Sequence, residues 1–113
     1  MKVIIWHNPG CGSSRAALQR LRDKGAEIDI YLYIKEQPSR QKIKEVLGLL
    51  DLKAADLVRL KDETAIELGL DRASNTTILA AMAAHPRLIQ RPIVISRKGA
   101  VIARPPMRVD EVL

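Results

Sequence analysis

Apolar and alternating runs near the start of the chain predict two strands around a helix. Residues 2–6, KVIIW, form a short apolar run before an Asn-Pro-Gly turn, and residues 28–34, IDIYLYI, alternate as a strand does. Between them, a helix capped by Ser13 or Ser14 and stopped by Gly25 has an apolar side, made by Ala16, Ala17, Leu18 and Leu21. Two strands around one helix predict a parallel, right-handed β-α-β unit.

The middle of the chain has apolar positions at helical spacing. Pro38-Ser39 opens a predicted helix that runs through about Leu50. Residues 54–68 fit one or two short helices that end at Gly69. Residues 75–85 fit a helix that Ser74 or Asn75 caps and Pro86 stops, and we expect His85 to cap its end and interact with the helix dipole.

The last third of the chain predicts a β-hairpin. The strands are residues 92–96, PIVIS, and 100–103, AVIA, around a Lys98-Gly99 turn, and the tail from Val109 adds a helical turn. The whole order predicts one α/β domain over residues 1–113 with a four-stranded mixed sheet. This is the order of a thioredoxin-like sheet, with the middle helices inserted between the β-α-β unit and the hairpin.

Composition places the chain among ordinary globular proteins. Its 113 residues are 47% hydrophobic and 28% charged. No apolar run is long enough to span a bilayer, and the start is too short for the apolar region of a signal peptide. A single cysteine forms no internal disulfide, so we expect a reducing, cytoplasmic location without membrane association.

Positive charge gathers in the last third of the chain. The formal net charge is +6, and residues 72–109 hold seven basic side chains, six of them arginine, with no acidic one. Such a field favours an anionic partner, and the guanidinium fork suits oxyanions. Nucleic acid is not the expected partner, because the chain has only one Trp and two Tyr to stack on bases and no recognised basic motif.

The only cysteine lies in the stretch HNPGCGSSR, residues 7–15. We expect the pKa of the Cys11 thiol to be lowered by the helix start that follows it, by Arg15 and by His7. The hydroxyls of Ser13 and Ser14 are further donors to a thiolate or an oxyanion. A lone cysteine is often a small buried apolar residue, but this one sits in a polar turn, which favours a functional thiol.

The stretch fits rival kinds of site less well, although the role of His7 stays open. His7 is as well explained by a satisfied hydrogen bond at a strand end as by a role in tuning the thiol. One Cys and two distant His residues lack metal-ligand spacing. The C-x5-R loop of cysteine phosphatases, the Walker A loop and the third glycine of the Rossmann fingerprint are all missing. A redox enzyme with one cysteine has no resolving thiol, so its reductant must come from outside.

Four segments together resemble the glutaredoxin-coupled arsenate reductase family, a family with a thioredoxin-like fold. They are HNPGCGSSR at 7–15, RLKDETAIELGL at 59–70, HPRLIQRPIVI at 85–95 and ARPP at 103–106. The resemblance implies that Cys11 is the nucleophile and that three arginines bind arsenate and its covalent adduct, namely Arg59, Arg91 and Arg104. It also implies thiolate-stabilising positions at His7, Ser14 and Arg15, and a cis peptide bond before Pro92.

The resemblance further implies the reaction and its partners. Arsenate would be reduced to arsenite, with glutathione as co-substrate, glutaredoxin as the regenerating partner and no bound cofactor. Two alternatives remain at this stage. One is a non-enzymatic regulatory or adaptor protein of the same fold, and the other is a glutathione-dependent thiol oxidoreductase with another substrate.

Overall fold

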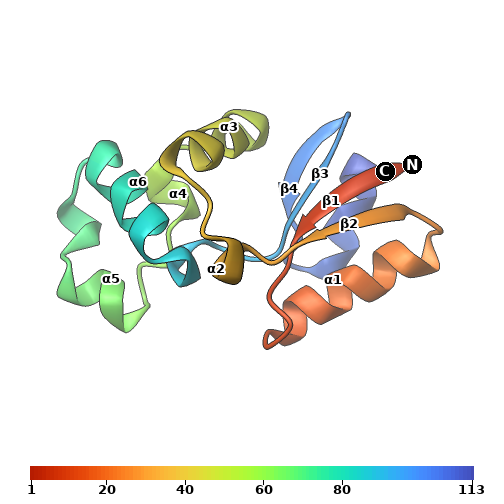
Figure 1. Ribbon diagram of the computed structural model, residues 1–113, viewed down its shortest axis with the longest axis horizontal. Coiled ribbons are helices and arrows are strands. Elements are labelled where there is room, and N and C mark those ends of the chain that lie inside the picture. The colour runs from red at the N-terminus through yellow and green to blue at the C-terminus, as the bar shows by residue number, and fades with distance from the viewer. The chain divides into compact units, whose positions relative to one another are not determined.

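The computed structural model describes residues 1–113 and divides the chain into two compact units (Figure 1). The first contains Met1–Glu36 and Arg91–Leu113, and the second contains Gln37–Gln90. The chain therefore leaves the first unit after its β-α-β portion and returns to it for the hairpin. This matches the predicted insertion of helices between two halves of a sheet, while the single-domain organisation stays a prediction.

The first unit is built on a four-stranded mixed sheet. Its strands are β1 (Lys2–Trp6), β2 (Glu27–Tyr31), β3 (Ile93–Ser96) and β4 (Gly99–Ile102). They lie in the order β2-β1-β3-β4, with β1 parallel to β2 and the other two pairs antiparallel. The predicted parallel β-α-β unit, the hairpin and the mixed sheet are thus confirmed.

One face of this sheet packs against α1 (Gly12–Asp23) and a C-terminal 3₁₀ helix, Pro106–Val112. Alternate residues of the strands turn towards these helices, as period-2 patterning requires. The resulting core joins all these elements through Val3, Ile5, Ala17, Leu18, Leu21, Val94, Val101, Ala103, Val109 and Val112. After α1, Gly25 adopts a φ of 72°, the left-handed conformation that commonly follows a helix end.

Two predicted boundaries in the first half are wrong. The N-cap of α1 is Cys11, and neither Ser13 nor Ser14 caps the helix. Strand β2 ends at Tyr31, and the last residues predicted as strand form α2 (Tyr33–Glu36). The alternation of IDIYLYI continues past the strand because Tyr33 is also buried, although it belongs to α2 and not to the sheet. Its ring lies 6.2 Å from that of Trp6.

Two details of the C-terminal part also differ from the prediction. Ser96 pairs with Gly99, so the hairpin loop is Arg97-Lys98 and Gly99 is the first residue of β4. The predicted helical turn from Val109 is a longer 3₁₀ helix that begins at Pro106. The change in the hairpin is within the ordinary variation of element ends, whereas the 3₁₀ helix begins further ahead of the predicted start.

The second unit is helical. It contains α3 (Arg40–Leu50), α4 (Ala54–Leu57), α5 (Glu63–Glu67) and α6 (Asn75–Ala84), with 3₁₀ turns at Leu70–Arg72 and Pro86–Leu88. Of the two predicted caps of α6, Ser74 is confirmed, since its hydroxyl accepts a hydrogen bond from the Thr77 N–H. The helix predicted to open at Pro38-Ser39 begins at Arg40, with Ser39 as an N-cap that accepts from the Lys42 N–H. His85 occupies the C-cap position of α6, and Gly69 follows α5 with a φ of 64°. None of the helices combines the length and apolarity needed to cross a membrane.

Candidate functional site

Strand pairing brings three functional segments to one edge of the sheet. Trp6, the last residue of β1, pairs with Ile93, the first residue of β3. Ala103, just after β4, donates its N–H to the Pro92 carbonyl at 2.9 Å. The Cys11 turn therefore follows the end of β1, Arg91 precedes the start of β3, and Arg104 follows the end of β4. These three strand ends lie side by side, as the predicted hairpin suggested.

Asn8 organises the turn between β1 and α1. Its side-chain Oδ1 accepts from the Gly10 N–H at 3.0 Å, and its carbonyl accepts from the Cys11 N–H at 3.0 Å. Its own N–H donates to the Ser14 hydroxyl at 3.0 Å. The sequence suggested only a turn former at Asn8, although Asn followed two residues later by Gly is the pattern of an Asx turn. Asn8 is thus a supporting residue of the site that the sequence reasoning missed.

Cys11 is partly exposed at the N-cap position of α1. Burial raises the pKa of its thiol, but hydrogen bonds from the Ser14 backbone, the Arg91 side chain and the Ser13 backbone outweigh burial, together with the Arg91 charge. The net effect is that the pKa of Cys11 is lowered. The helix start acts as predicted, because the N–H groups that lower the pKa belong to the first turn of α1.

Arg91 is the cation that acts on the sulfur. Its Nε and Nη1 atoms are buried and have no hydrogen-bond partner within the protein. Buried polar groups without partners are costly, so a guanidinium in this state is prepared to donate to an anion. The Arg91–Pro92 peptide is cis, as the resemblance implied, and the Arg104–Pro105 peptide is also cis, which was not predicted.

His7 and Ser14 form a buried pair behind the turn. Ser14 is fully buried and His7 is 6% exposed, with 2.6 Å between His7 Nδ1 and the Ser14 hydroxyl oxygen. Burial, helped by the charges of Arg22 and Arg15, lowers the pKa of His7 and favours the neutral imidazole. The satisfied hydrogen bond expected at the strand end is therefore present. That His7 helps to keep the thiol ionised stays a prediction.

The remaining predicted residues lie in different surroundings. Arg15 is exposed and its Nη1 donates to the Pro9 carbonyl at 2.8 Å, so it braces the turn. Arg104 is exposed at the end of the hairpin. Arg59 belongs to the second unit, where its Nη1 donates to the Arg87 carbonyl at 3.2 Å.

An acidic residue also faces Arg59. Asp62 Oδ2 lies 3.7 Å from Arg59 Nη1. Elsewhere in the structure, no group of three His, Cys, Asp or Glu side chains is arranged to hold a metal ion. Of the predicted set, Ser14 and Arg91 act on the Cys11 sulfur, and His7 is hydrogen-bonded to Ser14. Arg104 shares their sheet edge.

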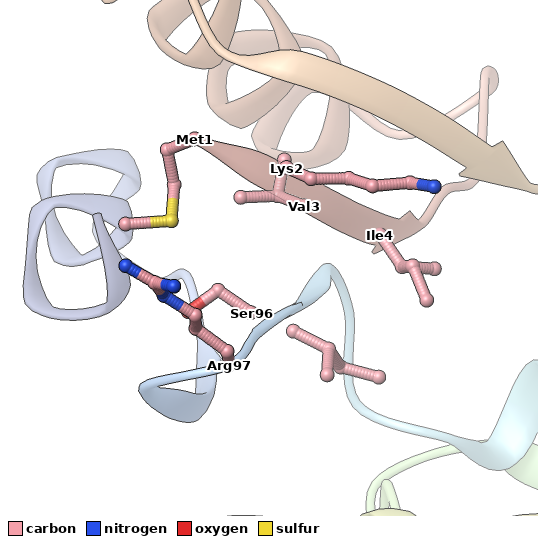
Figure 2. Close-up of a pocket in the computed structure, with 7 residues that line it drawn as sticks. Met1, Lys2, Val3, Ile4, Ser96 and Arg97 are labelled. Carbon is pink, nitrogen blue, oxygen red and sulfur yellow. The ribbon is translucent and has the colours of Figure 1, made fainter.

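A groove of about 590 Å³ lies at the start of β1, far along the strand from this turn (Figure 2). Met1, Lys2 and Ile4 line one side of it, and Ser96 and Arg97 lie across from them. The Ser96 hydroxyl already donates to the Val112 carbonyl at 2.5 Å and accepts from the Lys98 N–H at 3.0 Å. The Ser96 hydroxyl is therefore already engaged on both sides, whereas the Cys11 turn holds a thiol of lowered pKa.

Comparison with known proteins places these features in a family. The family model of the ArsC family matches residues 6–112, which includes the thiol turn and all three predicted arginines. The chain belongs to the ArsC family. Its thioredoxin-like fold is confirmed by the same comparisons.

Proteins named arsenate reductase align over nearly the whole chain. An arsenate reductase of Haemophilus influenzae is 42% identical over 118 residues and covers 100% of both chains. One from Neisseria meningitidis is 36% identical and covers 99% of this chain and 98% of its own. The solved structure of an arsenate reductase from Vibrio cholerae superposes with a TM-score of 0.96 at 38% identity, covering 100% of this chain and 98% of that one.

Proposed function

We propose that this ArsC-family protein reduces arsenate to arsenite, with Cys11 as the nucleophile. The observation that carries the proposal is the action of Arg91 on the Cys11 thiol. Arg91 helps to lower the pKa of that thiol, and its Nε and Nη1 atoms are buried without a protein partner. A nucleophile and an oxyanion-binding group side by side suit attack on a tetrahedral oxyanion. Relatives over the full length of the chain carry the name arsenate reductase, which supports the same substrate.

In the first step the Cys11 thiolate attacks arsenic, an arsenate oxygen leaves as water after protonation, and a sulfur–arsenic(V) bond forms. Arg91 donates to the oxygens of arsenate through Nε and Nη1, and its charge balances the charge that shifts onto them. Arg104 is proposed to assist from the same sheet edge. Arg59 is proposed to join them because its motif matches the family, and Ser14, Arg15 and His7 are proposed to hold the turn that presents the thiolate.

In the second step a glutathione thiol supplies the remaining electrons. Two thiols are oxidised to one disulfide, arsenic(V) takes up two electrons, and the products are arsenite and a Cys11–glutathione mixed disulfide. The chain has no second cysteine to resolve this disulfide, so glutaredoxin is the proposed regenerating partner.

The test is arsenate-dependent NADPH oxidation coupled through glutathione, glutaredoxin and glutathione reductase. We expect Cys11→Ser to abolish turnover and Arg91→Ala to lower kcat by about 10²-fold, the usual effect of removing one oxyanion donor. Arg97→Ala is the matched control, because Arg97 is exposed in the hairpin loop at the other end of β3, and it should retain activity.

Two outcomes would reject the arsenate proposal. Reduction of other disulfides by a folded, reactive Cys11 without arsenate turnover would favour a glutathione-dependent thiol oxidoreductase. A folded protein that lacks both activities but binds a partner protein would favour an adaptor, provided that the Cys11→Ser variant still binds that partner.

A further inference from the structure

A cavity of about 300 Å³ lies beside the thiol turn, where β1 and β2 end. The His7 N–H donates to the Tyr31 carbonyl at 2.9 Å, which brings the residues after β2 against the residues after β1. The cavity is lined by His7, Asn8, Pro9, Leu32, Ile34 and Lys35. All six belong to the first unit, so the cavity is formed within that unit.

This cavity shares its wall with the turn that holds Cys11. Asn8 and Pro9 line it, and the Asn8 carbonyl accepts the Cys11 N–H at 3.0 Å. Pro9 precedes Cys11 by two residues, so their Cα atoms lie at most roughly 7 Å apart. A small molecule seated here therefore lies against the turn that carries Cys11.

The lining has a definite chemical character. Pro9, Leu32 and Ile34 make apolar walls, and the Nδ1 of buried His7 is already engaged with Ser14. Lys35 is the one charged lining residue, it is exposed, and it has no ion pair within 4.0 Å. A few polar groups on an apolar lining are typical of small-molecule sites, and an unpaired ammonium favours a carboxylate.

A second reactant needs an approach to Cys11 that Arg91 and its anion do not occupy. Arg91 helps to lower the pKa of the Cys11 thiol, and its buried Nε and Nη1 donors, which have no partner in the protein, are assigned to an oxyanion by the proposed function. A thiol that attacks the adduct, or a disulfide that reacts with the free thiolate, has to approach without displacing that anion. The cavity offers such an approach on a wall made by the turn itself.

We propose that this cavity binds the peptide part of the thiol co-substrate, a carboxylate-bearing thiol of the size of glutathione, with Lys35 pairing with one carboxylate. The assignment of this ligand as a reductant rests on the proposed function. Binding itself does not require arsenate. The corresponding reaction without arsenate is attack of the Cys11 thiolate on oxidised glutathione, which forms the Cys11–glutathione disulfide and releases one glutathione thiolate.

The experiment measures the rate of this reaction by intact mass for wild type and Lys35→Glu, with oxidised glutathione and with uncharged hydroxyethyl disulfide. The charge reversal should slow the reaction with oxidised glutathione by about fivefold, the effect of an exposed ion pair at its upper range, and leave hydroxyethyl disulfide unaffected. Lys44→Glu is the matched control, because Lys44 is an exposed lysine on α3 that makes the same change in net charge.

Equal rates for Lys35→Glu and wild type with oxidised glutathione would overturn the site. Equal slowing by Lys44→Glu would also overturn it, since the effect would then come from net charge alone. The two proposals fail separately. If Lys35→Glu selectively slows the reaction with oxidised glutathione but the protein does not turn over arsenate, the binding site stands and the reductase proposal is rejected. If the protein turns over arsenate and Lys35→Glu leaves the KM for glutathione unchanged, the reductase proposal stands and the binding site is rejected.

Discussion

At Cys11, three donors from two parts of the chain decide the state of the sulfur. Ser13 and Ser14 act through backbone N–H groups at the start of α1, and Arg91 acts through its side chain from just before β3. The predicted effect of Arg15 takes a different form, because its guanidinium is bonded to the Pro9 carbonyl. The cation that lowers the pKa of Cys11 is Arg91. The sequence analysis gave Arg91 a role in substrate binding only.

The lowered pKa of Cys11 predicts fast alkylation near neutral pH. The rate of reaction with iodoacetamide, followed against pH, should show a midpoint below the value of about 8.5 for a free cysteine. Arg91→Ala should move this midpoint upward, because one hydrogen bond and one positive charge are lost. Arg97→Ala should leave it in place, and an unchanged midpoint in Arg91→Ala would contradict the role assigned to Arg91.

His7 predicts a loss of stability on mild acidification. Burial lowers its pKa in the folded protein, so the unfolded chain binds the proton more readily. The stabilising contribution is present above the unfolded pKa, about 6.5, and is lost as the pH falls below it. Urea unfolding should therefore give a decreasing free energy of unfolding from pH 7 to pH 5.

His7→Asn, which keeps a polar group near Ser14, should remove this part of the pH dependence. His85→Asn is the matched control, since His85 is exposed at the end of α6. If the pH dependence survives in His7→Asn, another group is responsible for it.

At the scale of elements, helix starts differ in what they are used for. The starts of α3 and α6 are closed by Ser39 and Ser74, whose hydroxyls accept backbone N–H groups. The start of α1 has Cys11 at the same position with no side-chain cap. Its free N–H groups serve the sulfur instead, because the hydroxyl of Ser14 is directed to His7 and Asn8.

The cap of α3 gives a prediction for stability. Ser39 accepts from the Lys42 N–H at 3.1 Å, so Ser39→Ala should lower the free energy of unfolding by about 1 kcal/mol. Ser39→Gly should cost only about a few tenths of a kcal/mol, because glycine is itself tolerated at this position. Urea unfolding at constant pH measures both. Equal losses in the two variants would show that the hydroxyl does not act as the cap.

For the whole molecule, the division into two compact units bears on how the chain unfolds. The predicted single domain implies one cooperative transition although the second unit contains no strand of the sheet. Trp6, the only tryptophan, reports on the first unit, whereas the helical circular dichroism signal comes from both units. We expect the two signals to change together in urea.

Leu21→Ala tests this cooperativity. Leu21 is fully buried in the core between α1 and the sheet, so its truncation should cost about 2–5 kcal/mol. Both the Trp6 signal and the circular dichroism signal should shift to lower urea by the same amount. A helical signal that keeps its wild-type midpoint while the Trp6 signal shifts would show two domains that unfold independently.

Much of the fold was accessible from local patterns. Periodicity and end signals located all four strands and the long helices, because these depend on residues within a few positions of each other. The end of β2 was missed because Tyr33 continues the alternation yet packs with Trp6 from a different element. Element ends of this kind depend on packing partners that are distant in the chain.

The site divides in the same way. The candidate thiol and the helix that follows it are predicted by HNPGCGSSR, because both are local features. The sequence placed the cap at Ser13 or Ser14, however, and only the structure shows Cys11 itself at the N-cap position. The partners of the sulfur and of Ser14 required the folded chain, because a pKa responds to groups a few ångströms away in space. Arg91 reaches Cys11 because antiparallel pairing of β3 with β1 returns it to the same sheet edge.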